Sequence, residues 1–340
     1  MRVPEVPDPS IPLLLGESPA IRTVKAEIQS AARSHAKVLI GGETGVGKEV
    51  VARMIHDLSA RRGRAFIAVN CSGIPETLLE SELFGHTRGS FTGAYRDKIG
   101  LVRQADRGTL FLDELGEMSL RMQAVLLRFT ETGEIQSIGA EGPTARADVR
   151  LITATNRDLR AQITAGAFRE DLYYRLSVIR IRVPSLRERR DEIPHLASFF
   201  LREACERLGK PDIELSTAAL DLFAQYLWPG NVRQLRNEIQ RAVALSAPGG
   251  TVIPDMLSPE LASLADPGAV LLPTPGLRRP AAVSLAAAVE EVERELIRST
   301  LDRTHGNISE TARVLGLTRR GLYLKLRRLG MEQRGGVDTN

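Results

Sequence analysis

From Leu13 to Val183, short β-branched apolar runs alternate with amphipathic helical patterns. This alternation predicts an α/β fold, with a parallel sheet and helices on both of its faces. The helical pattern is clearest in Lys48–Leu58, where one face carries Val50, Val51, Met54, Ile55 and Leu58. The predicted strands are Lys37–Ile40, Ala65–Val69, Thr109–Asp113, Val149–Thr155 and Val178–Val183.

The β-branched runs stop after Pro184. Helical periodicity over Asp191–Leu208, Ser216–Tyr226 and Val232–Ser246 predicts a small helical subdomain. The segment Trp228-Pro229-Gly230-Asn231 breaks the chain, and we expect Asn231 to cap the helix that follows.

Seven prolines lie between Pro248 and Val283, where no long periodic segment occurs. This composition predicts a semi-extended interdomain linker. Helical periodicity returns at Ser284 and lasts almost to the C-terminus. The expected divisions are a tail at 1–12, an α/β core at 13–183, a helical subdomain at 184–247, a linker at 248–283 and a helical domain at 284–340.

The composition is that of an ordinary globular protein, with 43% hydrophobic and 26% charged residues. A net charge of +4 is too small for wholesale nucleic-acid coating, so local charge matters more. Cys71 and Cys205 have no metal-site or disulfide spacing and are expected to be small buried residues in a reducing compartment. Neither a signal peptide nor a membrane-length apolar run is visible, so we expect a cytoplasmic protein without a membrane partner.

The sequence GETGVGKE at 42–49 follows an apolar strand and opens a helix. Its glycines let the backbone curl so that N–H groups face phosphate oxygens, and Lys48 can reach the outer phosphates. Glu49 stands where the general P-loop pattern has Ser or Thr, so the hydroxyl that usually helps to hold Mg²⁺ is missing there. A chance glycine turn is the alternative. The predicted nucleotide-binding residues are Gly42, Glu43, Thr44, Gly45, Val46, Gly47, Lys48 and Glu49.

A second motif, GTLFLDE at 108–114, is an apolar strand that ends in two carboxylates. Ligands of open α/β sheets bind at this end of the strands. Asp113 is expected to orient Mg²⁺ and its waters, and Glu114 to polarise the water that attacks the γ-phosphate. A strand that ends in acidic residues is common alone, but the two motifs in this order favour hydrolysis of a nucleotide with Mg²⁺.

The segment ESELFGHTRGSFTGA at 80–94 resembles the bacterial enhancer-binding proteins, the AAA+ activators of sigma-54 RNA polymerase. The resemblance runs from about Leu13 to Ala247, and implies a P-loop core with a helical lid. The family has GAFTGA where this chain has Gly89, Ser90, Phe91, Thr92, Gly93 and Ala94. It implies a mobile loop whose Phe91 and Thr92 contact sigma-54. The alternative is a turn whose Phe91 folds back into the core; nearby His86 is expected to be structural.

The resemblance also implies three roles around the nucleotide. Asn70 resembles the switch residue that holds the catalytic glutamate, here Glu114. Asn156, in LITATN, resembles the first sensor of the γ-phosphate, and Arg233, in WPGNVRQL, the second sensor in the lid. Gln234 follows where the family usually has Glu.

In FREDLYYRL, Arg169 and Arg175 match the arginines that the family supplies to a neighbouring protomer. A guanidinium placed there would stabilise charge on the transferring phosphoryl group. The alternative is surface ion pairing with Glu170 and Asp171. The resemblance implies a homo-oligomer, a hexameric ring assembled from dimers.

The C-terminal sequence NISETARVLGLTRRGLYLKLRRLG at 307–330 predicts two short helices with a turn at Gly316. Asn307 or Ser309 could cap the first helix, and Thr318 caps the second. The segment resembles the Fis-type helix-turn-helix, which implies binding to enhancer DNA; the alternative is a helical hairpin with a solvated basic face. The predicted DNA contacts are Thr318, Arg319, Arg320, Tyr323, Lys325, Arg327 and Arg328.

Together with these motifs, the resemblance implies an ATP-dependent transcription activator that remodels sigma-54 RNA polymerase. Two rivals remain: a different AAA+ remodeller, and a DNA-bound repressor whose ATPase coupling has decayed. The GSFTGA loop argues against the first, and the carboxylate pair with the arginines against the second.

Overall fold

The structure is a computed structural model that describes residues 14–91, 93–140, 144–264, 293–294, 297–301, 303–304, 307–329 and 331. The chain forms two compact units, Met1–Val270 and Leu271–Asn340. The predicted tail at 1–12 and most of the predicted linker lie outside the described residues, as does Thr92.

The first unit contains a parallel five-stranded sheet in the order β2-β5-β8-β1-β9. The five predicted strands are therefore confirmed, with end points that shift by a residue or so. Buried apolar residues on both faces explain why these segments form the sheet interior. The strands are β1 (Val38–Gly41), β2 (Phe66–Asn70), β5 (Thr109–Asp113), β8 (Arg150–Thr155) and β9 (Ile179–Arg182).

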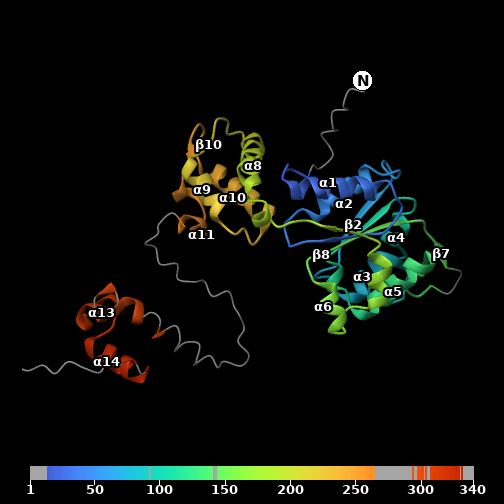
Figure 1. Cartoon of the computed structure of the whole chain (residues 1–340). Helices are drawn as coiled ribbons and strands as arrows, with labels where there is room; N and C mark the ends of the chain where they lie inside the picture. The colour runs from blue at the N-terminus through green and yellow to red at the C-terminus, as the bar shows by residue number, and fades with distance from the viewer. Residues whose placement is uncertain are drawn as a thin grey trace, which may run out of the picture. The chain divides into compact units, whose positions relative to one another are not determined.

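Helices cover both faces of this sheet, as the alternating pattern predicts (Figure 1). One face carries α1 (Pro19–Ala32) and α2 (Lys48–Asp57). The other carries α3 (Glu76–Phe84), α4 (Leu101–Gln104), α5 (Leu120–Thr132), α6 (Leu159–Thr164) and α7 (Glu170–Leu176). In α2, Val51 and Ile55 are buried against the sheet, whereas Leu58 lies just past the helix end and is 51% exposed.

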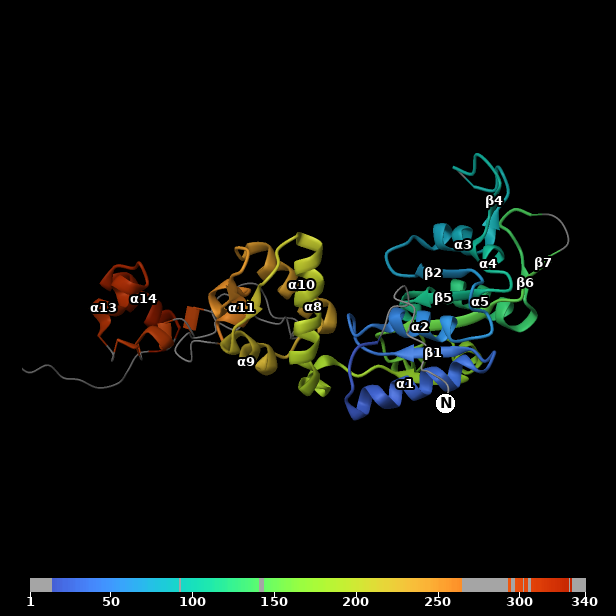
Figure 2. The ribbon, with the colours of Figure 1, turned by 90° about the horizontal axis from the view of Figure 1, so that it is seen from above.

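Two short hairpins interrupt this alternation, and their two-residue strands are too short to leave a periodic signal. The first pairs β3 (Gly85–His86) with β4 (Lys98–Ile99), and its loop extends away from the sheet in Figure 2. The second pairs β6 (Glu134–Ile135) with β7 (Ala145–Arg146).

A helical subdomain follows the sheet. Its helices are α8 (Ile193–Leu208), α9 (Thr217–Gln225) and α10 (Asn231–Leu245), and they confirm the three predicted helical segments. They are preceded by η2 (Leu186–Glu188) and η3 (Arg190–Glu192), and buried Trp228 lies in their shared core.

The helical subdomain continues past 247, so the prediction that a linker begins at 248 is wrong. β11 (Thr251–Val252) pairs with β10 (Glu214–Leu215), and η4 (Pro254–Met256) and α11 (Pro259–Ala262) follow. Buried Val252, Leu257 and Leu261 join the same core. The prolines here start short helical turns, a position that suits proline, rather than extending the chain.

The predicted cap of α10 is also different. Gly230 is the N-cap, and Asn231 is the first helical residue, fully buried and at a φ of +52°. The Asn231 side chain accepts a hydrogen bond from the Leu186 backbone N–H at 2.8 Å instead of capping its own helix. The local pattern could not show this, because the partner lies 45 residues away.

In the second unit, α13 (Ile308–Val314) and α14 (Arg319–Arg328) pack around a small apolar core. Of the two predicted caps for α13, Asn307 is the one used, accepting from the N–H groups of Ser309 and Glu310. Thr318 caps α14, as predicted, and Gly316 makes the turn at a φ of +66°. The core residues are Ile297, Ala312, Leu322, Leu326 and Leu329.

Candidate nucleotide site and its attached surfaces

The glycine-rich loop joins β1 to the N-terminus of α2 at the carboxyl edge of the sheet. Gly45 and Gly47 adopt φ values of +82° and +105°, in the left-handed region that favours glycine. Gly42 donates its N–H to the Thr155 carbonyl at 3.2 Å, which fixes the loop to β8. This geometry places a helix N-terminus and a curled backbone where a phosphate group would lie.

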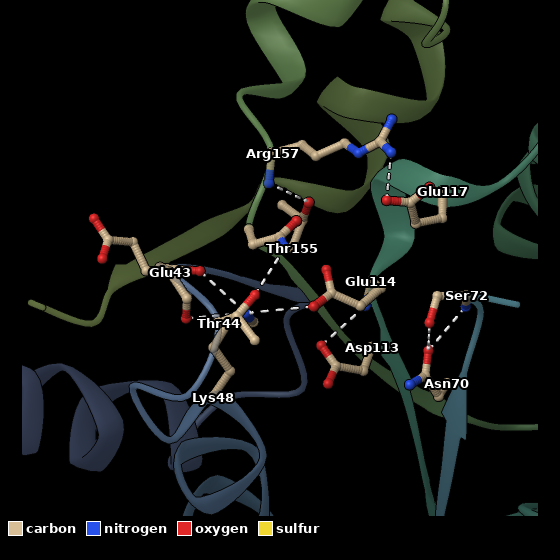
Figure 3. Close-up of polar contacts among 12 residues, drawn as sticks. Glu43, Thr44, Lys48, Asn70, Ser72, Asp113, Glu114, Glu117, Thr155 and Arg157 are labelled. Carbon is tan, nitrogen blue, oxygen red and sulfur yellow. Dashed lines mark hydrogen bonds and ion pairs between the residues drawn. The ribbon is translucent and has the colours of Figure 1, made fainter. Parts of the chain in front are cut away.

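The Lys48 side chain is 5% exposed and folds across this loop. Its Nζ donates to the carbonyl oxygens of Gly42 at 3.0 Å and Glu43 at 3.3 Å. The same Nζ lies 3.8 Å from Glu114 Oε1 (Figure 3). The P-loop and the carboxylate motif, 66 residues apart in sequence, therefore meet at one ammonium group.

Asp113 and Glu114 occupy the end of β5 and the residue after it. Asp113 Oδ1 accepts the backbone N–H of Glu114 at 2.9 Å. Glu114 has a φ of +53° and a ψ of +45°, a conformation that costs about 1–3 kcal/mol for a residue other than glycine. Its Oε2 is buried and has no hydrogen-bond partner among the described residues. A strained carboxylate with an unsatisfied buried oxygen is suited to hold a water molecule.

The residues at this edge fit a magnesium ion that is held largely by nucleotide phosphates. No group of three or more His, Cys, Asp or Glu within the described part of the chain could hold a metal alone. Mg²⁺ in nucleotide sites commonly takes one or two carboxylates, with phosphates and water as its other ligands. Asp113 supplies such a carboxylate, whereas Glu49 is exposed on the first turn of α2.

Asn70 lies opposite Asp113 in the pairing of β2 with β5, at the same edge. Its Oδ1 accepts hydrogen bonds from the backbone N–H and the hydroxyl of Ser72, each at 2.8 Å. Figure 3 shows this contact beside Glu114. No hydrogen bond joins Asn70 to Glu114 in the described structure. The role of Asn70 in holding the glutamate therefore stays a prediction.

The two predicted sensors both reach the P-loop. Asn156 Nδ2 donates to the Thr44 hydroxyl at 3.0 Å. Arg233 donates its backbone N–H to the Gly45 carbonyl at 3.2 Å, while its side chain is exposed. The first contact comes from the end of β8 and the second from α10, so the sheet and the helical subdomain both border the loop.

The predicted trans-acting arginines make contacts within their own part of the chain. Arg169 forms a two-pronged ion pair with Asp171, with Nη2 2.6 Å from Oδ2. Arg175 Nε donates to the Thr130 carbonyl at 3.4 Å. Both arginines are exposed, and none of their described contacts reaches Lys48, Asp113 or Glu114. The pairing of Arg169 with Asp171 is the surface ion pairing that the alternative interpretation predicts, and the trans-acting role of both arginines stays a prediction.

The GSFTGA loop closes the first hairpin. Gly89 donates its N–H to the Ala94 carbonyl at 2.8 Å, and Gly89 and Gly93 have φ values of +82° and +108°. Phe91 is half-buried and packs edge-on against His86, with 5.0 Å between ring centroids. Phe91 therefore folds against the base of its own loop and does not enter either core of the sheet.

His86 links this loop to its surroundings. Its Nδ1 lies 2.7 Å from the Ser81 hydroxyl on α3. Next to it, the Thr87 N–H donates to the Ile138 carbonyl, and the Ile138 N–H donates to the Gly85 carbonyl. The base of the first hairpin and the β6–β7 loop are thus joined by backbone hydrogen bonds, and His86 has the structural place expected of it.

In the second unit, α14 exposes Arg319, Arg320 and Tyr323 on its first turns. Lys325 Nζ lies 2.6 Å from Glu293 Oε1, and Arg328 pairs with the other oxygen of the same carboxylate. Hydrogen bonding to Lys325 lowers the pKa of Glu293. The basic stripe of α14 is therefore partly neutralised by a carboxylate that lies 32 residues earlier.

Comparison with known proteins agrees with this geometry. Residues 14–182 match the sigma-54 interaction domain, 187–269 the AAA+ ATPase lid domain, and 288–329 the Fis family of bacterial regulatory proteins. The chain belongs to the sigma-54-dependent transcriptional activators. The predicted family, fold class and function are confirmed: this activator combines a AAA+ ATPase domain with a Fis-type DNA-binding helix-turn-helix.

Curated relatives and solved structures lie in the same family. The transcriptional regulatory protein ZraR of Klebsiella oxytoca is 45% identical over 93% of this activator and 68% of its own length. The response regulator protein PilR of Pseudomonas aeruginosa is 43% identical over 94% and 70%. NtrX from Brucella abortus, solved in complex with ATP, is 34% identical, with a TM-score of 0.70 over 93% of this activator and 69% of that chain. NtrX in complex with ADP gives a TM-score of 0.71.

Sequence patterns missed two residues of this activator that touch the P-loop from the lid side. Arg187 Nη1 donates to Glu43 Oε2 at 2.8 Å, and Asn231 Nδ2 donates to the same oxygen at 3.1 Å. The partners lie 144 and 188 residues apart, so no local pattern could have found them.

The two cysteines of this activator form no disulfide. Cys71 is buried and Cys205 half-buried, and both are free thiols. Burial, with Asp113 and Glu114 nearby, raises the pKa of Cys71 to about 12. Within the part of the chain that the structure describes, no helix is long and apolar enough to cross a membrane.

Proposed function

We propose that this sigma-54-dependent activator binds ATP in the loop at 42–49 and hydrolyses it with Glu114, inside a ring of identical protomers. The observation that carries the proposal is the meeting of Lys48 Nζ with Glu114 Oε1 at 3.8 Å. A phosphate group at this point would contact the buried ammonium group of Lys48, and the largely buried Glu114 carboxylate would hold the attacking water beside it.

Each residue has a distinct task in this proposal. Lys48 leaves the carbonyls of Gly42 and Glu43 and donates to the outer phosphates. Glu114, whose Oε2 lacks a partner among the described residues, orients the attacking water and polarises it. Asp113 would hold Mg²⁺ with the phosphates, and the ion would neutralise charge on the β- and γ-oxygens. Asn156 would read the γ-phosphate through its place beside Thr44.

Arg169 and Arg175 are assigned to the site of the neighbouring protomer, in a hexameric ring assembled from DNA-bound dimers. Their exposure and their lack of described contacts with their own Lys48 or Glu114 support this assignment. A guanidinium that enters a phosphoryl-transfer site is worth about 10³–10⁵ in rate. To act there, the Arg169 guanidinium would have to leave the Asp171 carboxylate and bind the phosphate.

The energy of hydrolysis is proposed to move the loop at Gly89–Ala94, releasing Phe91 from His86 toward sigma-54. The backbone hydrogen bonds of Ile138 with Thr87 and Gly85 support this route, because they join the base of the first hairpin, which carries the GSFTGA loop, to the second hairpin of the core. Arg233 would report the nucleotide to the lid, and Asn70 would hold Glu114 until the target binds. Thr318, Arg319, Arg320 and Tyr323 would enter the major groove of enhancer DNA, in the cytoplasm.

Mixed-protomer ATPase assays test the shared site. Glu114→Gln and Arg175→Ala chains should each be inactive alone. Mixed in equal amounts, they should regain activity, because about a quarter of the interfaces then pair an intact Glu114 with an intact Arg175. Arg146→Ala, which breaks an exposed ion pair with Glu134 at 3.2 Å, is the control and should keep normal turnover. Absence of recovery in mixtures that assemble normally would overturn the shared site.

A further inference from the structure

The Glu43 side chain belongs to the lid contact rather than to the phosphate cradle. Figure 3 shows its carboxylate turned away from Lys48 and Glu114. We infer that Glu43 is a positioning residue that fastens the P-loop to the helical lid through Arg187 and Asn231, and so places Arg233 over the nucleotide. The inference rests on the proposed ATP site.

The contact between Glu43 and Arg187 has the geometry of a specific pair. Both carboxylate oxygens accept from the guanidinium, with Arg187 Nη1 2.8 Å from Oε2 and Nη2 on Oε1. Two parallel charge-assisted bonds fix orientation as well as distance. These bonds lower the pKa of Glu43 to about 2, so the carboxylate is charged throughout the physiological range.

Asn231 supplies a third, buried connection. Its Nδ2 donates to Glu43 Oε2 and to the Thr44 carbonyl, each at 3.1 Å, and its Oδ1 accepts the Leu186 N–H at 2.8 Å. Asn231 is fully buried and held at a φ of +52°. One side chain therefore joins the P-loop, the entry to the lid and the first turn of α10. An exposed ion pair alone adds little to stability. Here the buried Asn231 amide also holds the Glu43 carboxylate in place.

The backbones also touch at this point. Arg233 donates its N–H to the Gly45 carbonyl at 3.2 Å, and a Cβ added at Gly45 would lie 2.2 Å from the Gly230 carbonyl oxygen. Arg233 follows Asn231 by two residues on the rigid helix α10. Asn231 and Arg233 therefore move together, so any movement of the P-loop relative to Asn231 also displaces Arg233 relative to the P-loop.

Glu43 is linked to the phosphates through its own backbone. Its carbonyl accepts from Lys48 Nζ at 3.3 Å while its carboxylate holds the lid. A phosphate that draws Lys48 away removes a hydrogen bond from the residue that anchors the lid. Glu43 would thus sense occupancy of the cradle on one side and position the lid on the other.

Glu43→Ala and Arg187→Ala in the full chain test the inference. Either change should raise the KM for ATP about tenfold while leaving kcat within about twofold, and the double variant should be no worse than either single one. Spin labels on the sheet and the lid should show a broader distance distribution in both variants, with and without ADP. The control is Arg236→Ala, which breaks a comparably exposed ion pair with Glu203 inside the lid and should change neither readout.

Unchanged KM and unchanged label distances in Glu43→Ala would overturn the inference, as would fully additive losses in the double variant. The nucleotide-free distance measurement keeps this test separate from the ATP site. If the wild-type chain bound no ATP, the proposed function would fail. A narrow wild-type distribution that broadens in Glu43→Ala would still support the fastening of the lid.

Discussion

Lys48 Nζ lies 3.8 Å from Glu114 Oε1, and both side chains are largely buried, at 5% and 15% exposure. The ammonium group is already bonded to two P-loop carbonyls, so the glutamate is placed beside the phosphate cradle without being fixed to it. This relationship separates nucleotide binding, which depends on Lys48, from hydrolysis, which depends on Glu114.

Glu114→Gln should bind ATP with near-normal affinity and hydrolyse it at least about a hundredfold more slowly, because an amide cannot act as a general base. Titration with a fluorescent ATP analogue and a phosphate-release assay measure the two steps. Glu117→Gln, which breaks a nearby ion pair with Arg157 at 2.5 Å, is the matched control. Near-normal phosphate release from Glu114→Gln would remove the glutamate from the mechanism.

Phe91→Ala should keep ATPase activity and lose promoter opening, because its ring contributes to the loop surface and not to the cores of the sheet. Thr92→Ala should behave in the same way. Permanganate footprinting of the promoter, beside ATPase assays of the same samples, measures both activities. Tyr95→Ala removes a ring that is 87% exposed just beyond the motif, and should open promoters normally. Full promoter opening by Phe91→Ala would contradict the assignment of the loop.

Arg327→Ala should weaken enhancer binding and lower the slope of log affinity against log salt by about 1, because its exposed guanidinium follows the turns placed in the major groove and would contact a phosphate. Lys325→Ala should change the slope less, because Glu293 already pairs with that ammonium group. Fluorescence anisotropy at several salt concentrations measures the slopes. Equal slopes for wild type and Arg327→Ala would show that α14 does not bind a phosphate through this residue.

The stability of the first unit should fall as the pH drops below about 6.5, the ordinary pKa of histidine. His56 is buried, with Nδ1 2.9 Å from the Thr109 hydroxyl, and burial lowers its pKa in the folded state. The unfolded chain therefore binds a proton at a pH where the folded chain does not. The folded state loses stability as the pH falls, until the folded pKa of His56 is reached. Urea unfolding between pH 7.5 and 5.5 should show a smaller loss for His56→Gln than for wild type. Exposed His195→Gln should keep the wild-type loss, and an identical loss in all three would contradict the assignment.

The sequence predicts the parts of this structure whose signal is local. The contiguous apolar residues of Thr109–Asp113 predict a buried strand. The glycines of GETGVGKE predict a P-loop, because such a loop needs left-handed backbone that glycine adopts easily. Caps at Asn307 and Thr318 are equally local, since each bonds within three residues.

Contacts between distant segments could not be predicted in this way. The local sequence predicts that Asn231 caps a helix, yet its side chain accepts a hydrogen bond from Leu186 and donates one to Glu43. Segment 248–264 looks like a linker because of its prolines, yet Val252 and Leu261 are buried in the lid core. The Glu293 carboxylate, 32 residues before Lys325 in the sequence, neutralises part of the positive charge of α14. In each case the pairing partner, and not the residue type, decides the role.

The most direct test is transcription in vitro by sigma-54 RNA polymerase from an enhancer-bearing template. The full chain should support open-complex formation with ATP, but not with a non-hydrolysable analogue, and Glu114→Gln should fail with either. Equal transcription with ATP and the analogue, or full activity of Glu114→Gln, would contradict the coupling of hydrolysis at this site to promoter opening.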